Sequence, residues 1–333
     1  MSDGVSDAEG VRPVRAGRRT VRIRRPGKVL FPGGEGAEEY TKGDLVDYHR
    51  AAAPFMLPHL RGRPLMLDRR PDGLAGPTFM QKNTPESYPE WITRVEVAKE
   101  GGTVCHTVCD DTATLLYLVD QASITFHRWL SRAAPIERIG RPDRLVFDLD
   151  PAEDDFGTVR EAARLLGELL DELKLPTALM TTGSRGLHVI VPLNGDDAFD
   201  DVRAFAREVA DTLADTHPDR LTTAARKKER GDRLYLDVQR NAYAQTAVAP
   251  GSVRALPGAP VAAPVSWDQL DEPKLHARRW TVADAVEQLR TDPWAGLPRR
   301  GRALGPARRR LAALRGLPAR PDDQARSATA ASG

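Results

Sequence analysis

The pattern of apolar positions is clearest over residues 144–151, where alternate side chains of a strand would point to opposite faces. Leu145, Phe147 and Leu149 give one wholly apolar face, while Asp148 and Asp150 share the other. Pro151 follows directly. Because proline cannot donate to a sheet ladder, the strand is expected to end there. The pattern therefore predicts two neighbouring carboxylates at the end of a buried strand.

Two later segments repeat this layout. Residues 187–193 alternate in the same way and put His188 on the polar face, directly after a turn that contains Gly183 and Gly186. Residues 233–238 place Asp237 on their polar face. If the apolar faces of these strands share one core, the polar side chains meet at one site.

Other segments show the three-to-four-residue spacing of amphipathic helices. A good N-cap, Thr41, opens the first of them. The acidic residues 153–155 are interpreted as the solvated start of another helix. The predicted helices cover residues 41–49, 51–60, the first part of 111–129, 158–173, 202–213 and 284–289, and shorter strands are predicted over 64–70, 78–82 and 124–129.

The net charge of +2 over 333 residues is unevenly distributed. Residues 1–25 carry +4 and residues 299–333 carry +7, which leaves −9 for residues 26–298. The composition predicts that residues 1–20 form a disordered basic tail. Residues 297–333 are predicted to be an Arg-rich tail or a frayed basic helix. A body with this charge would bind nucleic acid through a local patch and not through its bulk charge.

Cysteine content and hydropathy restrict the cellular setting. Cys105 and Cys109 are the only cysteines. Even with the histidine between them they supply at most three zinc ligands of the four that a structural site needs, so free thiols are favoured over zinc. No apolar run approaches the ~20 residues of a membrane helix, and the first residues lack the apolar region of a signal peptide. We therefore expect a soluble, cytoplasmic protein with no membrane partner.

The polar residues on the predicted strands suggest metal and phosphate chemistry. Asp148 and Asp150 would repel each other unless a cation lies between them or one is protonated. Oxygen ligands of this kind suit Mg²⁺ or Mn²⁺. The glycine turn can present N–H groups to an anion, with Ser184 and Arg185 adding a hydroxyl and a charge. The alternatives are a solvated strand end and an ordinary hairpin loop.

The order and spacing of these motifs resemble those of archaeo-eukaryotic primases and, more closely, of the polymerase domain of bacterial ATP-dependent DNA ligase D. The resemblance covers roughly residues 20–295. It implies an α+β primase-polymerase fold with a mostly antiparallel, RRM-like catalytic sheet flanked by helices. Within a domain over 21–296, an N-terminal α+β module would span about 21–135 and the catalytic core about 136–296. The residues that carry the resemblance are 148–151, 183–188 and 237, with support from 28–32, 41–44, 81–86, 249–254 and 267–270.

The resemblance also implies roles for individual residues. Asp148, Asp150 and Asp237 would be catalytic and hold two Mn²⁺ or Mg²⁺ ions. Lys28 and Lys42 would bind the 5′-phosphate of downstream DNA, and a helix N-terminus at Lys42 favours a phosphate. Arg185 stands where many relatives have lysine, and Gly251 where they usually have a bulkier residue. The residues implied for binding the nucleotide are Ser184, Arg185, His188, His127, Lys227, Arg230 and Arg254.

The activity implied is template-directed addition of NTPs or dNTPs to a primer 3′ hydroxyl, which fills gaps in bacterial non-homologous end joining. The implied partners are DNA with breaks or gaps, together with Ku and a separate ATP-dependent DNA ligase, in the bacterial nucleoid. No Lys-x-Asp-Gly adenylation motif occurs, so we expect a stand-alone polymerase without ligase or nuclease domains. Two alternatives remain: a catalytically weak module that grips DNA ends and recruits Ku or a ligase, and an unrelated metal-dependent phosphohydrolase.

Overall fold

The computed structural model describes residues 10–34, 37–99, 101–153, 155–298 and 300–317. Its main sheet has six strands, and all neighbours are antiparallel except the first pair. The predicted α+β architecture with a mostly antiparallel sheet is therefore confirmed. In spatial order the strands are β13 (Leu221–Thr222), β14 (Leu234–Asp237), β10 (Arg144–Asp150), β12 (Leu187–Pro192), β11 (Ala178–Thr181) and β16 (Pro264–Val265).

A second, four-stranded antiparallel sheet packs against the main sheet. Val146, Met180 and Ile190 of the main sheet form a buried apolar cluster with Ala247 and Val248 of the second sheet. These main-sheet residues share a face with Asp148 and His188, so the functional strand ends open beside this inter-sheet contact. The strands of the second sheet, in order, are β15 (Thr246–Val248), β9 (Ser123–Trp129), β5 (Leu65–Arg69) and β6 (Phe79–Gln81).

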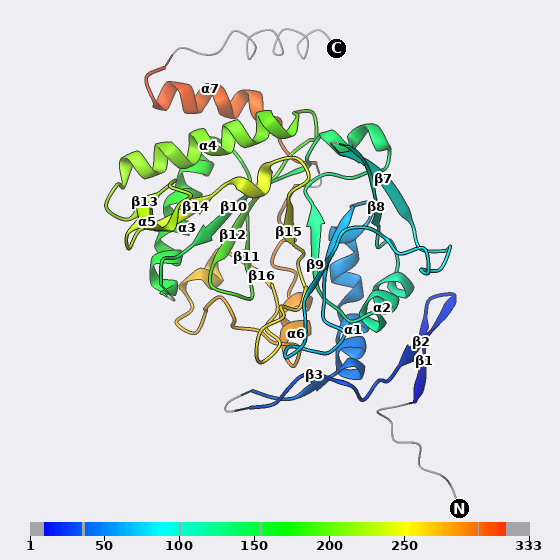
Figure 1. Ribbon diagram of the computed structural model, residues 1–333. Helices are drawn as coiled ribbons and strands as arrows, with labels where there is room; N and C mark the ends of the chain where they lie inside the picture. The colour runs from blue at the N-terminus through cyan, green and yellow to red at the C-terminus, as the bar shows by residue number, and fades with distance from the viewer. Residues whose placement is uncertain (1–9, 35–36, 100, 154, 299, 318–333) are drawn as a thin grey trace, which may run out of the picture.

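Helices α3 (Phe156–Glu172) and α4 (Phe199–Thr216) cover the opposite face of the main sheet (Figure 1). The predicted apolar face of β10, represented by Leu145, Phe147 and Leu149, is fully buried there. Asp155 caps α3 by accepting a hydrogen bond from a backbone N–H, as predicted for the acidic segment. This packing fixes the other face of β10, with its carboxylates, toward the second sheet.

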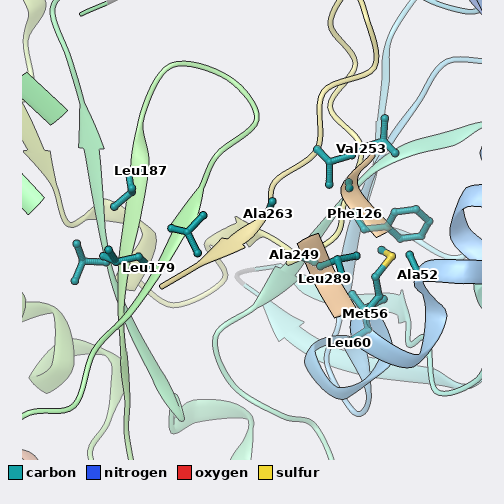
Figure 2. Close-up of a cluster of buried hydrophobic side chains, with 14 of the residues drawn as sticks. Ala52, Met56, Leu60, Phe126, Leu179, Leu187, Ala249, Val253, Ala263 and Leu289 are labelled. Carbon is teal, nitrogen blue, oxygen red and sulfur yellow. The ribbon is translucent and has the colours of Figure 1, made fainter. Parts of the chain in front are cut away.

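Helix α1 (Lys42–Leu60) is continuous, although the sequence predicted two helices. It begins at a capping box in which Thr41 and Asp44 exchange hydrogen bonds. Its apolar side chains pack with Phe126, and Figure 2 shows Met56 within this cluster. Helix α2 (Thr112–Asp120) packs against α1, and the predicted helix-then-strand order at α2 and β9 is confirmed.

The predicted disorder of residues 1–20 is wrong for residues 10–20. Strands β1 (Val11–Ala16) and β2 (Arg19–Arg24) form a hairpin. Val14, Val21 and Ile23 are buried in the core, and Arg24 forms an ion pair with Asp120, so apolar burial outweighs the basic composition. Residues 1–9 lie outside the described residues.

The C-terminal segment also folds further than expected. Helix α7 (Leu304–Leu314) buries Leu304, Ala307 and Leu311 and lies over α4 (Figure 1). The prediction of a tail or frayed helix is therefore wrong for residues 304–314, while residues 318–333 lie outside the described part. No helix in the described residues is both long enough and apolar enough to cross a bilayer.

Smaller elements complete the fold. Cys105 and Cys109 are free thiols, and Cys109 is buried. The remaining elements are β3 (Val29–Phe31), β4 (Tyr40–Thr41), β7 (Arg94–Lys99), β8 (Gly102–Thr107), α5 (Lys227–Arg230) and α6 (Ala285–Arg290), with 3₁₀ turns at Ile136–Gly140, Gln239–Asn241 and Asp268–Asp271.

Candidate active site

A polar pocket of about 250 Å³ opens where the two sheets meet. It contains the residues of all three predicted motifs, and β9, β15 and the 3₁₀ turn after β14 complete its wall. We call it the carboxylate pocket. Its lining residues are His127, Asp148, Asp150, Thr182, Ser184, Arg185, Gly186, His188, Asp237, Arg240, Thr246, Val248 and Arg254.

Sheet register brings the predicted carboxylates together. Asp148 lies directly opposite Asp237 on β14 and opposite His188 on β12. Directly opposed residues of antiparallel strands have Cα atoms about 4.5 to 5.5 Å apart. Asp150 follows two residues along β10, on the same face. Three neighbouring strands with independent sequence patterns thus place their polar residues at the same end of the strands.

Arginine side chains neutralise Asp150. Nη2 of Arg185 lies 2.8 Å from Oδ1 of Asp150, and Nη1 of Arg230 lies 3.0 Å from Oδ2. The Arg230 guanidinium also stacks on the ring of Tyr235, 3.9 Å from its centroid. Two predicted nucleotide-binding arginines therefore contact a predicted metal ligand.

The other two carboxylates have different partners. Asp148 lies 3.5 Å from Nε2 of His188 and 3.5 Å from Nε of Arg240. Burial raises the pKa of Asp148, but His188 and Arg240 outweigh it and hold the pKa below its ordinary value. Oδ1 of Asp237 accepts a hydrogen bond of 2.7 Å from the backbone N–H of Gln239. The carboxylates of Asp148 and Asp237 therefore both face groups that can donate hydrogen bonds to them.

The glycine turn depends on one positive φ and one close backbone approach. Gly183 has φ +63°, which favours glycine. A Cβ at Gly186 would lie 2.0 Å from the carbonyl oxygen of Leu149, so only glycine fits beside β10. The N–H groups of Ser184 and Gly186 donate to Oγ1 of Thr182, at 3.3 and 3.2 Å. These two N–H groups therefore form hydrogen bonds within the turn. This differs from the predicted anion site, in which they would donate to a bound anion. The side chains at positions 184 and 185 remain in the pocket wall.

Arg254 and His127 also line the pocket. Nη1 of Arg254 donates a 2.5 Å hydrogen bond to the carbonyl oxygen of Thr182. Burial lowers the pKa of Arg254. Burial, together with Arg254 and Arg240, lowers the pKa of His127 to about 3. His127 is therefore neutral at pH 7 and can form hydrogen bonds without adding charge.

Three predicted lysines lie outside the carboxylate pocket. Lys227 is exposed at the start of α5. Lys28 forms a 2.8 Å ion pair with Asp72, and its carbonyl accepts the backbone N–H of Lys42, so the fold does place these two lysines side by side. Nζ of Lys42 is buried and donates to two backbone carbonyls, one of them that of Asp120, at 2.9 Å each. The predicted phosphate contact of Lys42 disagrees with this geometry, because a structural ion pair occupies its ammonium group.

The sequence reasoning missed Arg240, Thr182 and Thr246. Arg240 follows Asp237 by three residues on a 3₁₀ turn, which brings its guanidinium back to Asp148. The adjacent Asn241 fixes this turn, because its side chain hydrogen-bonds both the N–H and the carbonyl of Val146 on β10. The signal in the sequence that could have indicated this contact was the pair Arg240 and Asn241 shortly after Asp237.

The donor chemistry of the carboxylate pocket fits hard divalent cations. It offers carboxylate oxygens from Asp148, Asp150 and Asp237, the ligand type that Mg²⁺ and Mn²⁺ take. As the side chains stand, no group of three His, Cys, Asp or Glu among the described residues is arranged to hold a metal ion. Arginines pair with Asp148 and Asp150, so Asp150 can act as a cation ligand only if it leaves Arg185 or Arg230.

Comparison with known proteins places the chain in a class and then in a family. The fold matches that of a nucleic-acid polymerase domain: the structure titled as the polymerase domain from Mycobacterium tuberculosis ligase D in complex with DNA aligns with a TM-score of 0.76 at 32% identity, over 82% of this chain and 95% of that one. The family model described as the LigD primase-polymerase domain matches residues 41–294. The chain belongs to this family, and the predicted fold is confirmed.

Full-length relatives give the same result over part of their length. The multifunctional non-homologous end joining protein LigD of Mycolicibacterium smegmatis is 34% identical over 80% of this chain and 35% of its own. The corresponding Pseudomonas aeruginosa protein is 33% identical over 84% and 33%, and the bifunctional Bacillus subtilis protein is 30% identical over 79% and 41%. The chain thus spans about a third to two fifths of the length of these relatives.

Proposed function

We propose that the chain is a DNA-directed nucleotidyltransferase that adds nucleotides to a primer 3′ hydroxyl on a template. The observation that carries the proposal is the meeting of Asp148, Asp150 and Asp237 with Arg185 and Arg254 in one pocket. Carboxylates for divalent cations and cations for a triphosphate are the two components that such a transfer requires.

In the proposed reaction the 3′ oxygen forms a bond to the α-phosphorus and pyrophosphate leaves. Asp148, Asp150 and Asp237 would hold Mn²⁺ or Mg²⁺, which lowers the pKa of the hydroxyl and stabilises the charge on pyrophosphate. Ser184, Arg185, His188 and Arg254 would bind the triphosphate of the NTP or dNTP; a further group, His127 and either Lys227 or Arg230, would support it. The guanidinium group of Arg254 can bind two phosphate oxygens at once.

The ion pairs at Asp150 suggest how substrate and metal binding are coupled. Arg185 and Arg230 neutralise Asp150 in the described conformation. A triphosphate would attract both guanidinium groups and release the carboxylate for a cation. Metal and nucleotide would then bind cooperatively. The triphosphate would draw the arginines away from Asp150, and a cation on Asp150 would free the same arginines for the triphosphate.

The proposed role is gap filling at DNA breaks in non-homologous end joining. Support comes from the relatives, which are named as proteins of that process. The partners would be gapped or broken DNA, Ku and a separate ATP-dependent DNA ligase, in the cytoplasm at the nucleoid. Lys28 would contact the 5′-phosphate of the downstream strand.

The second candidate is a module that binds DNA ends and recruits Ku or a ligase without efficient catalysis. Its specific support is the arginine pairing of Asp150, which neutralises a carboxylate without a metal. The two candidates differ in product and not in DNA affinity.

Primer extension separates these candidates. A labelled primer on a gapped duplex would be incubated with Mn²⁺ and either NTPs or dNTPs, with and without a downstream 5′-phosphate. The polymerase account predicts a ladder of longer products and one pyrophosphate per nucleotide added. Tight binding of the phosphorylated gap without extension would favour the end-binding module. Primer-independent release of inorganic phosphate would indicate a phosphohydrolase.

A further inference from the structure

A second polar cavity lies at the opposite end of β10 from the carboxylates. Its volume is about 370 Å³, and arginines dominate its wall. Arg144 begins β10 and Asp150 ends it. At ~3.3 Å per residue, the two ends of the strand are about 20 Å apart. We call this cavity the arginine pocket, and define it by Arg132, Arg138, Arg141, Arg144 and Arg300.

The positive charge of the arginine pocket is not balanced. Among the described lining residues Asp143 is the one acid. Its carboxylate already pairs with Arg63 at 2.6 Å and with Arg132 at 3.3 Å, and lies 3.9 Å from Arg144. Burial raises the pKa of Asp143, but the surrounding arginines lower it to about 2. One carboxylate therefore serves three guanidinium groups.

The remaining arginines face the cavity without an acidic partner. Within the described residues no ion pair joins Arg138, Arg141 or Arg300 to a carboxylate. The guanidinium group of Arg141 donates a hydrogen bond to the backbone carbonyl of Asp196. The body of the chain is acidic overall, with −9 over residues 26–298. The pocket is thus a local positive field on a negative body.

Two buried arginines strengthen this field. Arg63 and Arg128 are each 1% exposed. Nε and Nη1 of Arg128 have no hydrogen-bond partner in the described part of the chain. Burial, together with Arg63 and Arg144, lowers the pKa of Arg128. An unpartnered buried guanidinium is costly, so the fold concentrates positive charge here beyond what its own acids offset.

The C-terminal segment completes the pocket. Arg302 pairs with Leu193 in an isolated bridge. A Cβ at Gly301 would lie 2.4 Å from the backbone of Leu193, so glycine permits this close approach and holds Arg300 at the cavity. Arg300 lies after residue 294, where the match to the family ends. One wall of the pocket therefore comes from a segment outside that match.

We propose that the arginine pocket binds phosphate groups of a nucleic-acid strand, at a site separate from the carboxylate pocket. Guanidinium groups are suited to bidentate phosphate contact. No aromatic side chain lines the cavity among the described residues, so the site contacts the sugar-phosphate backbone and does not stack bases. Binding there is independent of sequence and depends strongly on salt.

The test is binding of a labelled single-stranded oligonucleotide of about twenty nucleotides, followed by fluorescence anisotropy at several salt concentrations. The variant is Arg138→Gln/Arg141→Gln, and the matched control is Arg50→Gln/Arg207→Gln, which removes the same charge from helices α1 and α4. We expect the pocket variant to bind about three- to tenfold more weakly. We also expect the slope of log affinity against log salt to fall by about 1.4, at about 0.7 for each lost contact.

The experiment measures binding, so its result does not depend on catalysis in the carboxylate pocket. When Asp150→Ala is added to both the pocket variant and the control, the difference in affinity between them should stay the same. An equal loss in variant and control, or no loss in either, would overturn the proposal. Inorganic pyrophosphate distinguishes a strand from a small phosphate compound. If pyrophosphate binds the wild type more tightly than the oligonucleotide does, and the pocket variant loses that binding, the nucleic-acid assignment is wrong. Unchanged melting temperatures would establish that both variants fold.

Discussion

Asp148 and Asp237 lie directly opposite each other on the antiparallel strands β10 and β14. Like charges in directly opposed positions destabilise a sheet. His188 and Arg240 offset the charge of Asp148, and they hold its pKa below the ordinary value even though burial acts in the opposite direction. The sheet therefore places two carboxylates face to face, an arrangement that costs stability and that a bound cation would relieve.

Removing one of these charges should stabilise the metal-free protein. For Asp237→Asn we expect unfolding in EDTA to require about 0.5 to 1 kcal/mol more free energy, because the opposed charges are gone. Added Mn²⁺ should raise the melting temperature of the wild type and have a smaller effect on the variant. Urea titrations and thermal melts with and without Mn²⁺ give both quantities. A variant that Mn²⁺ stabilises as strongly as the wild type would argue against a metal role for Asp237.

Arg185 is expected to act through its charge more than through its shape. It contacts Asp150 through a single nitrogen, and Arg230 contacts the other carboxylate oxygen. Arg185→Lys should therefore retain KM for the nucleotide within about threefold. Arg185→Gln should raise KM at least about tenfold, since hydrogen bonds to charged groups contribute about 1.5 to 3 kcal/mol. Steady-state extension kinetics check this, and equal effects of the two substitutions would contradict it.

Substitutions at Lys42 and at Lys28 should have different effects, the first on stability and the second on DNA binding. The buried Lys42 ammonium donates to two backbone carbonyls, so Lys42→Met leaves both without this donor and should cost about 1 to 3 kcal/mol of unfolding free energy for each. Asp120 keeps its ion pair with Arg24. Lys28→Met removes an ion pair whose carboxylate is exposed, so it should leave the unfolding free energy nearly unchanged. It should also reduce the preference for a gap with a 5′-phosphate. If the Lys42→Met protein is as stable as the wild type but has lost this preference, Lys42 contacts the 5′-phosphate and the structural role given to it is wrong.

Buried histidines predict that stability falls as the pH drops below 6.5. Burial lowers the pKa of His49 to about 4. Between about pH 6.5 and 4 the unfolded chain therefore binds a proton that the folded protein does not, and ΔG of unfolding decreases as pH falls. At pH 5 this one histidine accounts for at most about 2 kcal/mol. Urea unfolding of the wild type and His49→Gln at pH 7 and pH 5 tests this, and the variant should lose less stability. An equal loss would place the effect elsewhere.

Local patterns in the sequence were sufficient to predict the three strands that carry Asp148, His188 and Asp237. The short strands β13 and β16 were not predicted, and the antiparallel arrangement was implied by the resemblance alone. The alternation around Asp148, His188 and Asp237 defines a face within each strand, and the shared core then requires these faces to meet. The residues around the site were predicted less completely, because Arg240 reaches Asp148 only through a 3₁₀ turn that a distant hydrogen bond to β10 fixes.

Burial that depends on distant contacts could not be predicted from local composition. The segment at residues 10–20 is basic and polar, yet Val14 is buried once the hairpin packs on the core. Lys42 was expected to contact a phosphate at a helix N-terminus, but its ammonium group donates to the carbonyls of Arg24 and Asp120. The partners lie more than fifteen residues away in both cases: α2 for the hairpin, and Arg24 and Asp120 for Lys42.

The most direct test of the central claim is single-nucleotide extension by the wild type and Asp150→Ala on the same gapped duplex, with binding of that duplex measured in parallel. Asp150 is paired with two arginines, and its replacement removes a proposed cation ligand while leaving the apolar face of β10 intact. We predict that the variant binds the duplex and keeps its fold but loses extension by at least about a thousandfold. Extension by the variant at a rate near that of the wild type would contradict the assignment of these carboxylates as the catalytic metal site.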